Sequence, residues 1–238
     1  PGADRRQITR VGQVVNDALR QRPRPVLVLL THCHRDHVRE VRSLESSTPP
    51  WVLAHETAAR ALAQGDRALT MAEIYDEDAP RCEVHVPLFP TGAASAVLRP
   101  FALGHGHSLT VTPIPGNAAL RAERLQVGTD FFLMYHVPGH SPDSVALRAG
   151  AVIFCGDLTV AARPLVAGAP GWDQPALIAS LGGVVPLLRG GDLAVLAPGH
   201  GYSLSAAAAA AMLERTLATV ESLSNLESVD AERVRLLA

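Results

Sequence analysis

The chain has 238 residues, of which 47% are hydrophobic and 18% charged, the proportions of a folded globular protein. Chains of this length commonly form one α/β domain, and no linker-like segment or change of composition divides the sequence, so we expect a single domain over residues 1–238. The formal net charge of −2 offers no basic surface for a phosphate backbone. A small-molecule substrate is therefore favoured over a nucleic-acid partner.

The cysteines and the apolar segments argue against two further classes of protein. Cys33, Cys82 and Cys155 are odd in number and form no CxxC pair, so the sequence supports neither a disulfide framework nor a thiolate zinc site. A reducing compartment, the cytoplasm, is the simpler interpretation. No apolar run approaches the roughly 18 residues that a membrane-spanning helix needs, so no membrane association is expected.

The chain is expected to open with a helix followed by a buried strand. Apolar residues recur at helical spacing over residues 4–22, with Asp4 as the N-cap, until Pro23 and Pro25 interrupt the pattern. Val26–Leu30 is an apolar run typical of a strand buried on both faces. The polar segment that follows it would lie at the edge of a sheet, where α/β folds usually place their sites.

Further short strands alternate with helices along the rest of the chain. Apolar runs bounded by turn residues predict strands at Val52–His55, Val84–Leu88, Leu109–Ile114, Phe131–Val137, Ser144–Leu147, Ala151–Phe154 and Leu193–Leu196. The runs on either side of residues 148–150 are expected to form a hairpin. Helices are predicted over Glu56–Gln64 with Gly65 as its cap, from Pro175 to about Leu188, and after Ser205. Irregular loops are expected to join the strands within residues 76–120.

Four potential metal ligands follow the first predicted strand. In the segment THCHRDH, His32 and His34 alternate along an extended stretch, so both imidazoles project to the same side. Asp36 and His37 come after the chain turns and can address a second ion close by. Imidazole and carboxylate together suit zinc, iron or manganese. The segment by itself indicates two metal ions.

Three more candidate ligands follow other predicted strands. His140 in VPGHSPDS and His200 in APGHG each come after an apolar run and a proline-glycine turn, which directs the side chain away from the strand end. Asp157 occupies the same kind of position in FCGDL, where Gly156 permits close backbone approach and a carboxylate could bridge two ions. Each alone is as readily a turn residue or a satisfied polar group. Their recurrence at strand ends favours a shared site.

The succession THCHRDH, PGH, GD and GH resembles the metallo-β-lactamase superfamily over residues 26–201, in a hydrolase branch similar to glyoxalase II. The resemblance implies one metal held by His32, His34 and His140. It implies a second metal held by Asp36, His37 and His200, with Asp157 bridging the two. It also implies an αββα sandwich of two mixed β-sheets, with helices outside and the metals at one edge.

Two features depart from that family pattern. The first two or three strands of the family are not recognisable in this chain, so we expect them in a segment outside this sequence or from another chain, including a second copy of this protein. Asp143 stands where the family often has glycine. The interval between His37 and His140 is long, and we expect it to shape the substrate pocket.

The resemblance predicts a hydrolase and leaves two alternatives. Two divalent ions, zinc with iron or manganese as substitutes, would lower the pKa of a bridging water toward about 7. The hydroxide would attack an ester, thioester or lactone, and Asp36 would handle a proton near the bridge. One alternative is a single iron on His32, His140 and Asp157, as in the family's persulfide dioxygenases. The other is a non-catalytic metal-binding protein of the same fold. Such a protein would be expected to have lost some of the family's ligands, but all seven positions are filled.

The remaining candidates receive weaker assignments. No motif position matches His55, His85, His105, His107 or His136, and we expect none of them to bind a metal. Cys33 and Cys155 neighbour predicted ligands but are expected to point into the core. Arg163 and Tyr202 lie just beyond ligand segments and are weak candidates for substrate contact.

Overall fold

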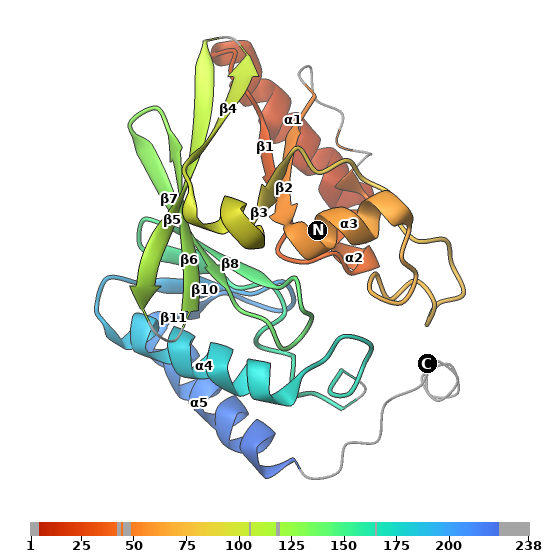
Figure 1. The fold of residues 1–238 in the computed structure, drawn as a ribbon, viewed down its shortest axis with the longest axis vertical. Coiled ribbons are helices and arrows are strands. Elements are labelled where there is room, and N and C mark those ends of the chain that lie inside the picture. Colours follow the sequence, from red (N-terminus) through yellow and green to blue (C-terminus); the bar gives the residue numbers. More distant parts are fainter. Residues whose placement is uncertain are drawn as a thin grey trace.

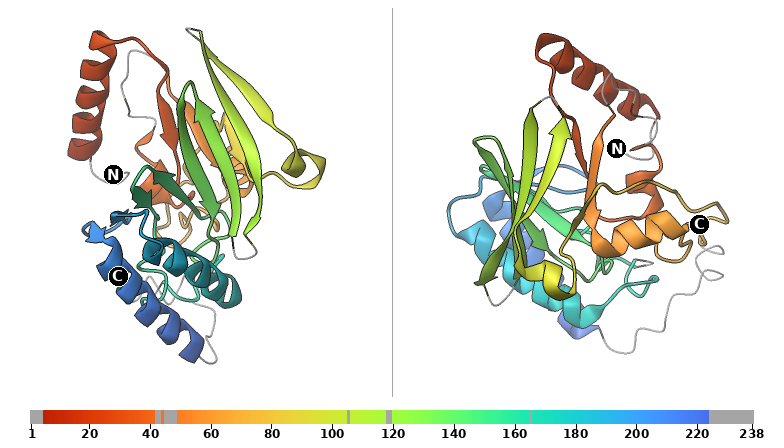
Figure 2. Two further views of the ribbon diagram at one scale, coloured as in Figure 1. Left: turned by 90° about the vertical axis from the view of Figure 1, so that its left-hand side faces the viewer. Right: turned by 45° about the horizontal axis from the view of Figure 1, so that its top comes forward.

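Two β-sheets packed face to face, with helices on both outer sides, make up the fold in the computed structural model (Figure 1). The structure describes residues 5–41, 44, 49–104, 106–117, 120–164 and 166–223. The predicted N-cap Asp4 and His105 lie outside these residues. The αββα sandwich expected from the sequence is confirmed, and Figure 2 shows its layers from two further sides.

The smaller sheet has three strands in the order β1 (Leu27–Leu29), β2 (Trp51–His55) and β3 (Val86–Leu88). Both pairs are parallel. In the described residues this sheet is therefore purely parallel, whereas the sequence led us to expect a mixed sheet. Parallel neighbours need a crossover connection, and helical segments supply one between each pair of strands. Among the described residues no strand precedes β1, which forms one edge of the sheet.

The larger sheet has eight strands in the order β11-β10-β9-β8-β7-β6-β5-β4 and is mixed, because β9 and β10 are parallel while the other pairs are antiparallel. Its strands are β4 (Arg99–Gly104), β5 (His107–Asn117), β6 (Leu120–Val127), β7 (Asp130–His136), β8 (Val145–Ala149), β9 (Val152–Phe154), β10 (Val195–Ala197) and β11 (Leu204–Ser205). The predicted hairpin is confirmed as β8 and β9.

Strands β4, β6 and β11 were not predicted from the sequence. In β6 the apolar alternation is interrupted by Glu123, which is buried all the same. Its Oε1 lies 2.6 Å from a guanidinium nitrogen of Arg99 on β4, and its Oε2 accepts the N–H of Phe89 at 3.0 Å. A buried charge with such partners is tolerated, but its place in the strand cannot be recognised from hydropathy alone.

The helices are α1 (Arg5–Gln21), α2 (Arg35–Val38), α3 (Glu56–Gln64), α4 (Gln174–Arg189) and α5 (Ala206–Ser222), with a 3-10 helix over Gly92–Ala96. The predicted caps are confirmed: Gly65 ends α3 at φ +70°, and the Ser205 hydroxyl accepts the N–H of Ala208 at 3.3 Å. No helix in the described part of the chain is long and apolar enough to cross a membrane.

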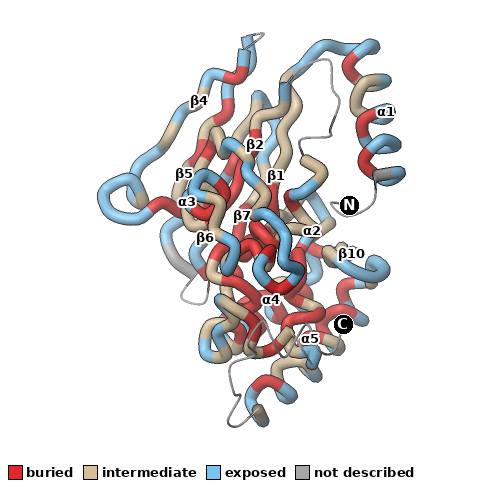
Figure 3. The backbone as a smooth tube through the Cα atoms, turned by 90° about the vertical axis from the view of Figure 1, so that its right-hand side faces the viewer, coloured by how far each residue is buried: buried red, intermediate tan, exposed pale blue. Residues whose placement is uncertain are grey.

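Three apolar clusters hold the layers together. Leu53 on β2 and Met134 on β7 meet between the two sheets. Val52 points to the opposite face of β2, toward Leu62 of α3, as the alternation of a strand requires. Leu177 on α4 belongs to the third cluster, where α4 and α5 cover the larger sheet. Figure 3 shows buried residues gathered in these layers, whereas exposed residues recur along α1.

Candidate metal centre

The first group of predicted ligands lies on the loop after β1 and on α2. The backbone is extended at His34, with φ −59° and ψ 143°, and then turns directly into α2. The N–H of His37 donates to the carbonyl of His34 at 2.9 Å, which closes this turn. The N–H of Arg35 donates to the carbonyl of Thr70, which fixes the start of α2 against the loop after α3. The short helix thereby places Asp36 and His37 beside the preceding histidines.

The other predicted ligands follow three strands of the larger sheet, namely β7 for His140, β9 for Asp157 and β10 for His200. Because β9 and β10 are parallel neighbours, their carboxyl ends meet at the same edge. The N–H of Gly199 donates to the carbonyl of Gly156 at 2.7 Å, so the two loops stay paired beyond the strands. His200 Nε2 consequently lies 3.4 Å from Asp157 Oδ2.

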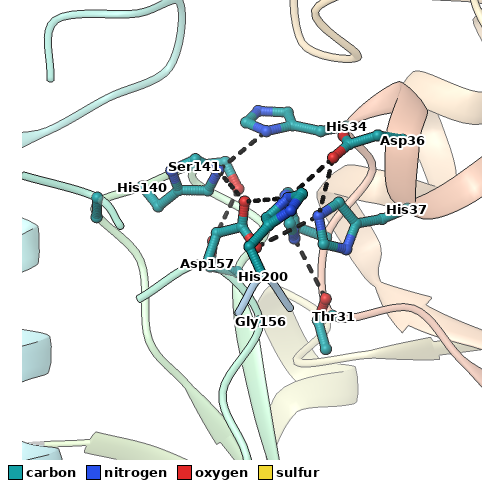
Figure 4. A network of polar contacts seen from close by, with 12 residues as sticks. Thr31, His34, Asp36, His37, His140, Ser141, Gly156, Asp157 and His200 are labelled. Carbon is teal, nitrogen blue, oxygen red and sulfur yellow. Dashed lines mark hydrogen bonds and ion pairs between the residues drawn. The ribbon is translucent and has the colours of Figure 1, made fainter. Parts of the chain in front are cut away.

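The structure brings all seven predicted ligands together. Figure 4 shows the polar contacts among those it labels, which are His34, Asp36, His37, His140, Asp157 and His200. One set of ligand atoms within 4.8 Å of one another comes from His32, His34 and His140. A second set within the same distance comes from Asp36, His37 and His200, and a third from His32, His37 and Asp157. The first two sets have the composition expected for two ions.

Asp157 lies close to both sets of predicted ligands. Its Oδ1 is 3.3 Å from His37 Nε2, in the second predicted set. Its Oδ2 is 3.7 Å from His140 Nε2, in the first. One carboxylate therefore reaches both sets, which is the arrangement expected of a bridging ligand.

Solvent reaches the two sets unequally. His32, His34 and His140 are 1%, 5% and 6% exposed. In the other set the side chain of His200 is 51% exposed and that of Asp36 is 33% exposed. A substrate can therefore approach from the side of His200. His32, His34 and His140 close the opposite side of the site to solvent.

Burial governs the protonation of the three-histidine set. It lowers the pKa of His32, His34 and His140, and the neighbouring imidazoles lower the pKa of His32 and His34 further. Their neutral forms are thus favoured, and a neutral imidazole is the form that binds a metal ion.

His37 and Asp157 shift one another's protonation. Burial lowers the pKa of His37, but hydrogen bonding to Asp157 and the carboxylate charges outweigh it, and the net shift is upward. Burial likewise raises the pKa of Asp157, and contact with His37 outweighs this, so its pKa is lowered. The pair favours an anionic carboxylate beside the histidines.

Several buried polar atoms of the cluster have no hydrogen-bond partner among the described residues. They are His32 Nε2, His34 Nε2 and His140 Nδ1, whereas His37 Nε2 and Asp157 Oδ1 face each other at 3.3 Å. Buried polar atoms without a partner are rare in folded proteins. Nitrogen and carboxylate donors of this kind suit zinc, iron or manganese, so the residues present fit a bound cation.

Gly199 has a role that the sequence did not reveal. The PGH segment predicted a turn, but a Cβ at Gly199 would overlap Asp157 Oδ1 and lie 2.8 Å from His37 Cε1. Gly156 is also confined, because its φ is +54° and a Cβ there would lie 3.0 Å from Thr31 Oγ1. Only glycine lets these two loops close over the carboxylate.

None of the described residues given weaker assignments belongs to either set. His55 and His136 stack with ring centroids 4.4 Å apart, and the Nδ1 of His85 accepts the N–H of Val52. Cys33 and Cys155 are 0% and 2% exposed, which confirms their expected place in the core. Arg163 and Tyr202 are exposed, Tyr202 to 92%, and a contact of either with substrate stays a prediction.

Comparisons with known proteins agree with the fold. The sequence model of the metallo-beta-lactamase superfamily matches residues 15–204. A search of curated proteins finds no match. Among solved structures, the B3 metallo-beta-lactamase BLEG-1 is 23% identical, with 87% of this chain and 81% of that chain covered and a TM-score of 0.57.

Two further structures have a similar fold. TTHA1623 in a di-iron-bound form is 24% identical, with 87% of this chain and 82% of that chain covered and a TM-score of 0.50. ETHE1 from Myxococcus xanthus is 17% identical, with coverages of 93% and 79% and a TM-score of 0.50. At these identities the similarity concerns the fold alone.

Proposed function

The chain belongs to the metallo-β-lactamase superfamily, and on this premise we propose that it is a hydrolase with two metal ions. The observation that best supports the proposal is the position of Asp157, whose two oxygens lie 3.3 Å from His37 Nε2 and 3.7 Å from His140 Nε2. A carboxylate that reaches two sets of three ligands suits a pair of ions about 3.5 to 4 Å apart. The similar structure TTHA1623 is itself in a di-iron-bound form.

The proposed ligands divide as the resemblance implied. The first ion would be held by His32, His34 and His140, the second by Asp36, His37 and His200, with Asp157 shared. The proposed metal is zinc, with iron or manganese as alternatives. Two such ions would supply a hydroxide at neutral pH and polarise the acyl group of a substrate.

The protein itself supplies a proton carrier, Asp36, and a buried side that excludes water. Asp36 Oδ2 lies 3.0 Å from His200 Nε2 and 3.4 Å from His37 Nε2, on the solvent side of the site. We assign to the Asp36 carboxylate the catalytic role of accepting the proton that is released when water ionises to hydroxide, and of returning that proton to the leaving group. The buried histidines exclude bulk water from the opposite side.

The proposed substrate is a small ester, thioester or lactone. This fold hosts many reactions on loops of varied shape, so the acyl group is not specified by the ligands. An alternative is a dioxygenase with one iron on two histidines and a carboxylate. The dioxygenase is supported by the proximity of its three expected ligands. His32 and His140 belong to one set of ligand atoms, and His140 Nε2 lies 3.7 Å from Asp157 Oδ2.

Metal content and turnover, measured together, test the proposal. We expect about two ions per chain by elemental analysis, with hydrolysis of generic ester, thioester or lactone substrates. About one iron per chain, with oxygen consumed on addition of a persulfide and no hydrolysis, would support the dioxygenase instead. Bound metal with neither reaction would indicate a non-catalytic protein.

A matched pair of variants makes the test specific. Asp157→Asn should lower both hydrolysis and the number of ions retained, because the shared carboxylate is lost. Asp192→Asn is the control, since its side chain is 76% exposed and pairs with Arg148 at 3.5 Å. Equal behaviour of the two variants would count against the bridge.

A further inference from the structure

Asp143 is a completely buried acid that the proposed reaction does not use. It lies on the loop between β7 and β8 that also carries His140, and it is 0% exposed. Its Oδ2 accepts the backbone N–H of Cys33 at 2.7 Å. Cys33 stands between His32 and His34, so this one hydrogen bond joins the two loops that supply the three-histidine set.

A second bond runs beside the first. The N–H of Val145 donates to the carbonyl of Thr31 at 2.7 Å, and the hydroxyl of Thr31 lies 3.2 Å from His32 Nδ1. The histidine segment is therefore held at residue 33 by the loop that carries His140 and at residue 31 by the first residue of β8. The bond at Thr31 joins two backbone groups, whereas the bond at Cys33 depends on the side chain of Asp143.

The backbone at Cys33 is an effective point from which to orient both histidines. Along an extended segment, side chains alternate, so the Cys33 side chain points away from those of His32 and His34. Its Sγ lies 3.7 Å from the carbonyl of Leu69, within the core on the side of α3. A shift of the Cys33 N–H would therefore move both imidazoles together relative to His140.

We propose that Asp143 is a positioning residue for the buried ion. By accepting the Cys33 N–H it holds His32 and His34 at the distance from His140 that a metal requires, with His34 Nδ1 and His140 Nε2 now 3.0 Å apart. The inference rests on the metal site of the proposed function and requires no particular substrate. Residues that orient metal ligands in this way typically change metal affinity about 10- to 100-fold.

Zinc affinity and folding, measured separately, test the role of Asp143. The affinity of the tighter zinc ion is measured by competition with a chromophoric chelator. The free energy of unfolding of the metal-free protein is measured in urea. Asp143→Ala should raise the zinc dissociation constant about 10- to 100-fold, because the tie at Cys33 is lost. Asp143→Asn keeps an oxygen acceptor and should restore an affinity close to that of the unchanged protein.

Ser144→Ala is the matched control. Ser144 lies on the same loop and is 8% exposed, and its hydroxyl bonds Ser141 Oγ at 2.8 Å rather than Cys33. It should leave the zinc affinity unchanged even if it lowers the free energy of unfolding. Asp143→Gly, which also lacks the acceptor, replaces the alanine variant if that variant does not fold.

The outcomes separate the positioning role from the proposed function. Unchanged zinc affinity in Asp143→Ala, or an equal loss in Asp143→Asn, overturns the positioning role. Absence of tight zinc in the unchanged protein overturns both inferences. Lack of hydrolysis with the expected order of affinities overturns the proposed reaction alone.

Discussion

The two halves of the candidate centre differ in how the protein surrounds them. His32, His34 and His140 are almost entirely buried and have lowered pKa values. In the other half, the side chains of His200 and Asp36 remain open to solvent. Burial prepares neutral ligands that water does not displace, whereas exposure leaves room for a substrate and for exchange of the ion. The comparison predicts a retained ion on one side and an exchangeable ion on the other.

Removal of a buried ligand should have the largest effect. We expect His32→Ala to lose one ion per chain and to lower hydrolysis by more than about 100-fold, beyond the usual effect of residues that merely orient ligands. His107→Ala is the control, because His107 is exposed on β5. Metal analysis and turnover are measured on both variants, and full turnover in His32→Ala would contradict the assignment.

Removal of an exposed ligand should act on the weaker ion alone. We expect His200→Ala to weaken the exchangeable ion roughly 10- to 100-fold and to leave the affinity of the tighter ion unchanged. Stepwise chelator titration of zinc from His200→Ala and His34→Ala measures this. Loss of the tighter ion in both variants would mean that the two halves do not bind independently.

Lower pH should destabilise the metal-free protein. In the unfolded chain histidines titrate near 6.5, whereas burial lowers the pKa of His32, His34 and His140 when folded. Below about pH 6.5 the unfolded chain therefore binds protons that the folded chain does not. The free energy of unfolding should fall as pH decreases, by up to about 1.4 kcal/mol per pH unit for each histidine.

His37 opposes this trend, because its raised pKa gives stability that is present below about pH 6.5 and lost as pH rises. Burial also lowers the pKa of His55 and His136, so five histidines whose folded pKa is lowered outweigh the one whose pKa is raised, and the net effect is a loss of stability as pH falls. Urea unfolding at about pH 7.5 and pH 5.5 measures the difference. If the metal-free protein were equally stable at both pH values, the buried histidines would bind protons as readily in the folded protein as in the unfolded chain.

A methyl group at Gly199 should have the smallest effect. Because the new Cβ would meet Asp157 and His37, we expect Gly199→Ala to reduce the free energy of unfolding by about 1 to 3 kcal/mol and to weaken metal binding. Gly182→Ala on α4 is the control, since no atom lies within 4 Å of its Cβ and alanine favours a helix. Chemical denaturation distinguishes them, and equal stabilities would show that the loops move apart easily.

The sequence predicted which candidate ligands come together better than it predicted the strands or the supporting residues. His32, Asp157 and His200 could be found because each is a polar residue at the end of an apolar run. Strand β6 was missed because the buried Glu123 depends on Arg99, a partner from another strand. The roles of Asp143 and Gly199 depend on contacts with distant segments, which hydropathy and spacing do not contain.

The separation of the ligands along the chain has a consequence for how the protein matures. His32 follows the first strand of the smaller sheet and His200 follows the tenth strand, near the end of the larger one. Such distant residues meet only after long loops have closed, which is slow in topologies of high contact order. An ion cannot nucleate this fold as it does a small zinc finger, whose ligands are close in sequence. A metal ion held by these residues would therefore be taken up late in maturation, after both sheets have docked.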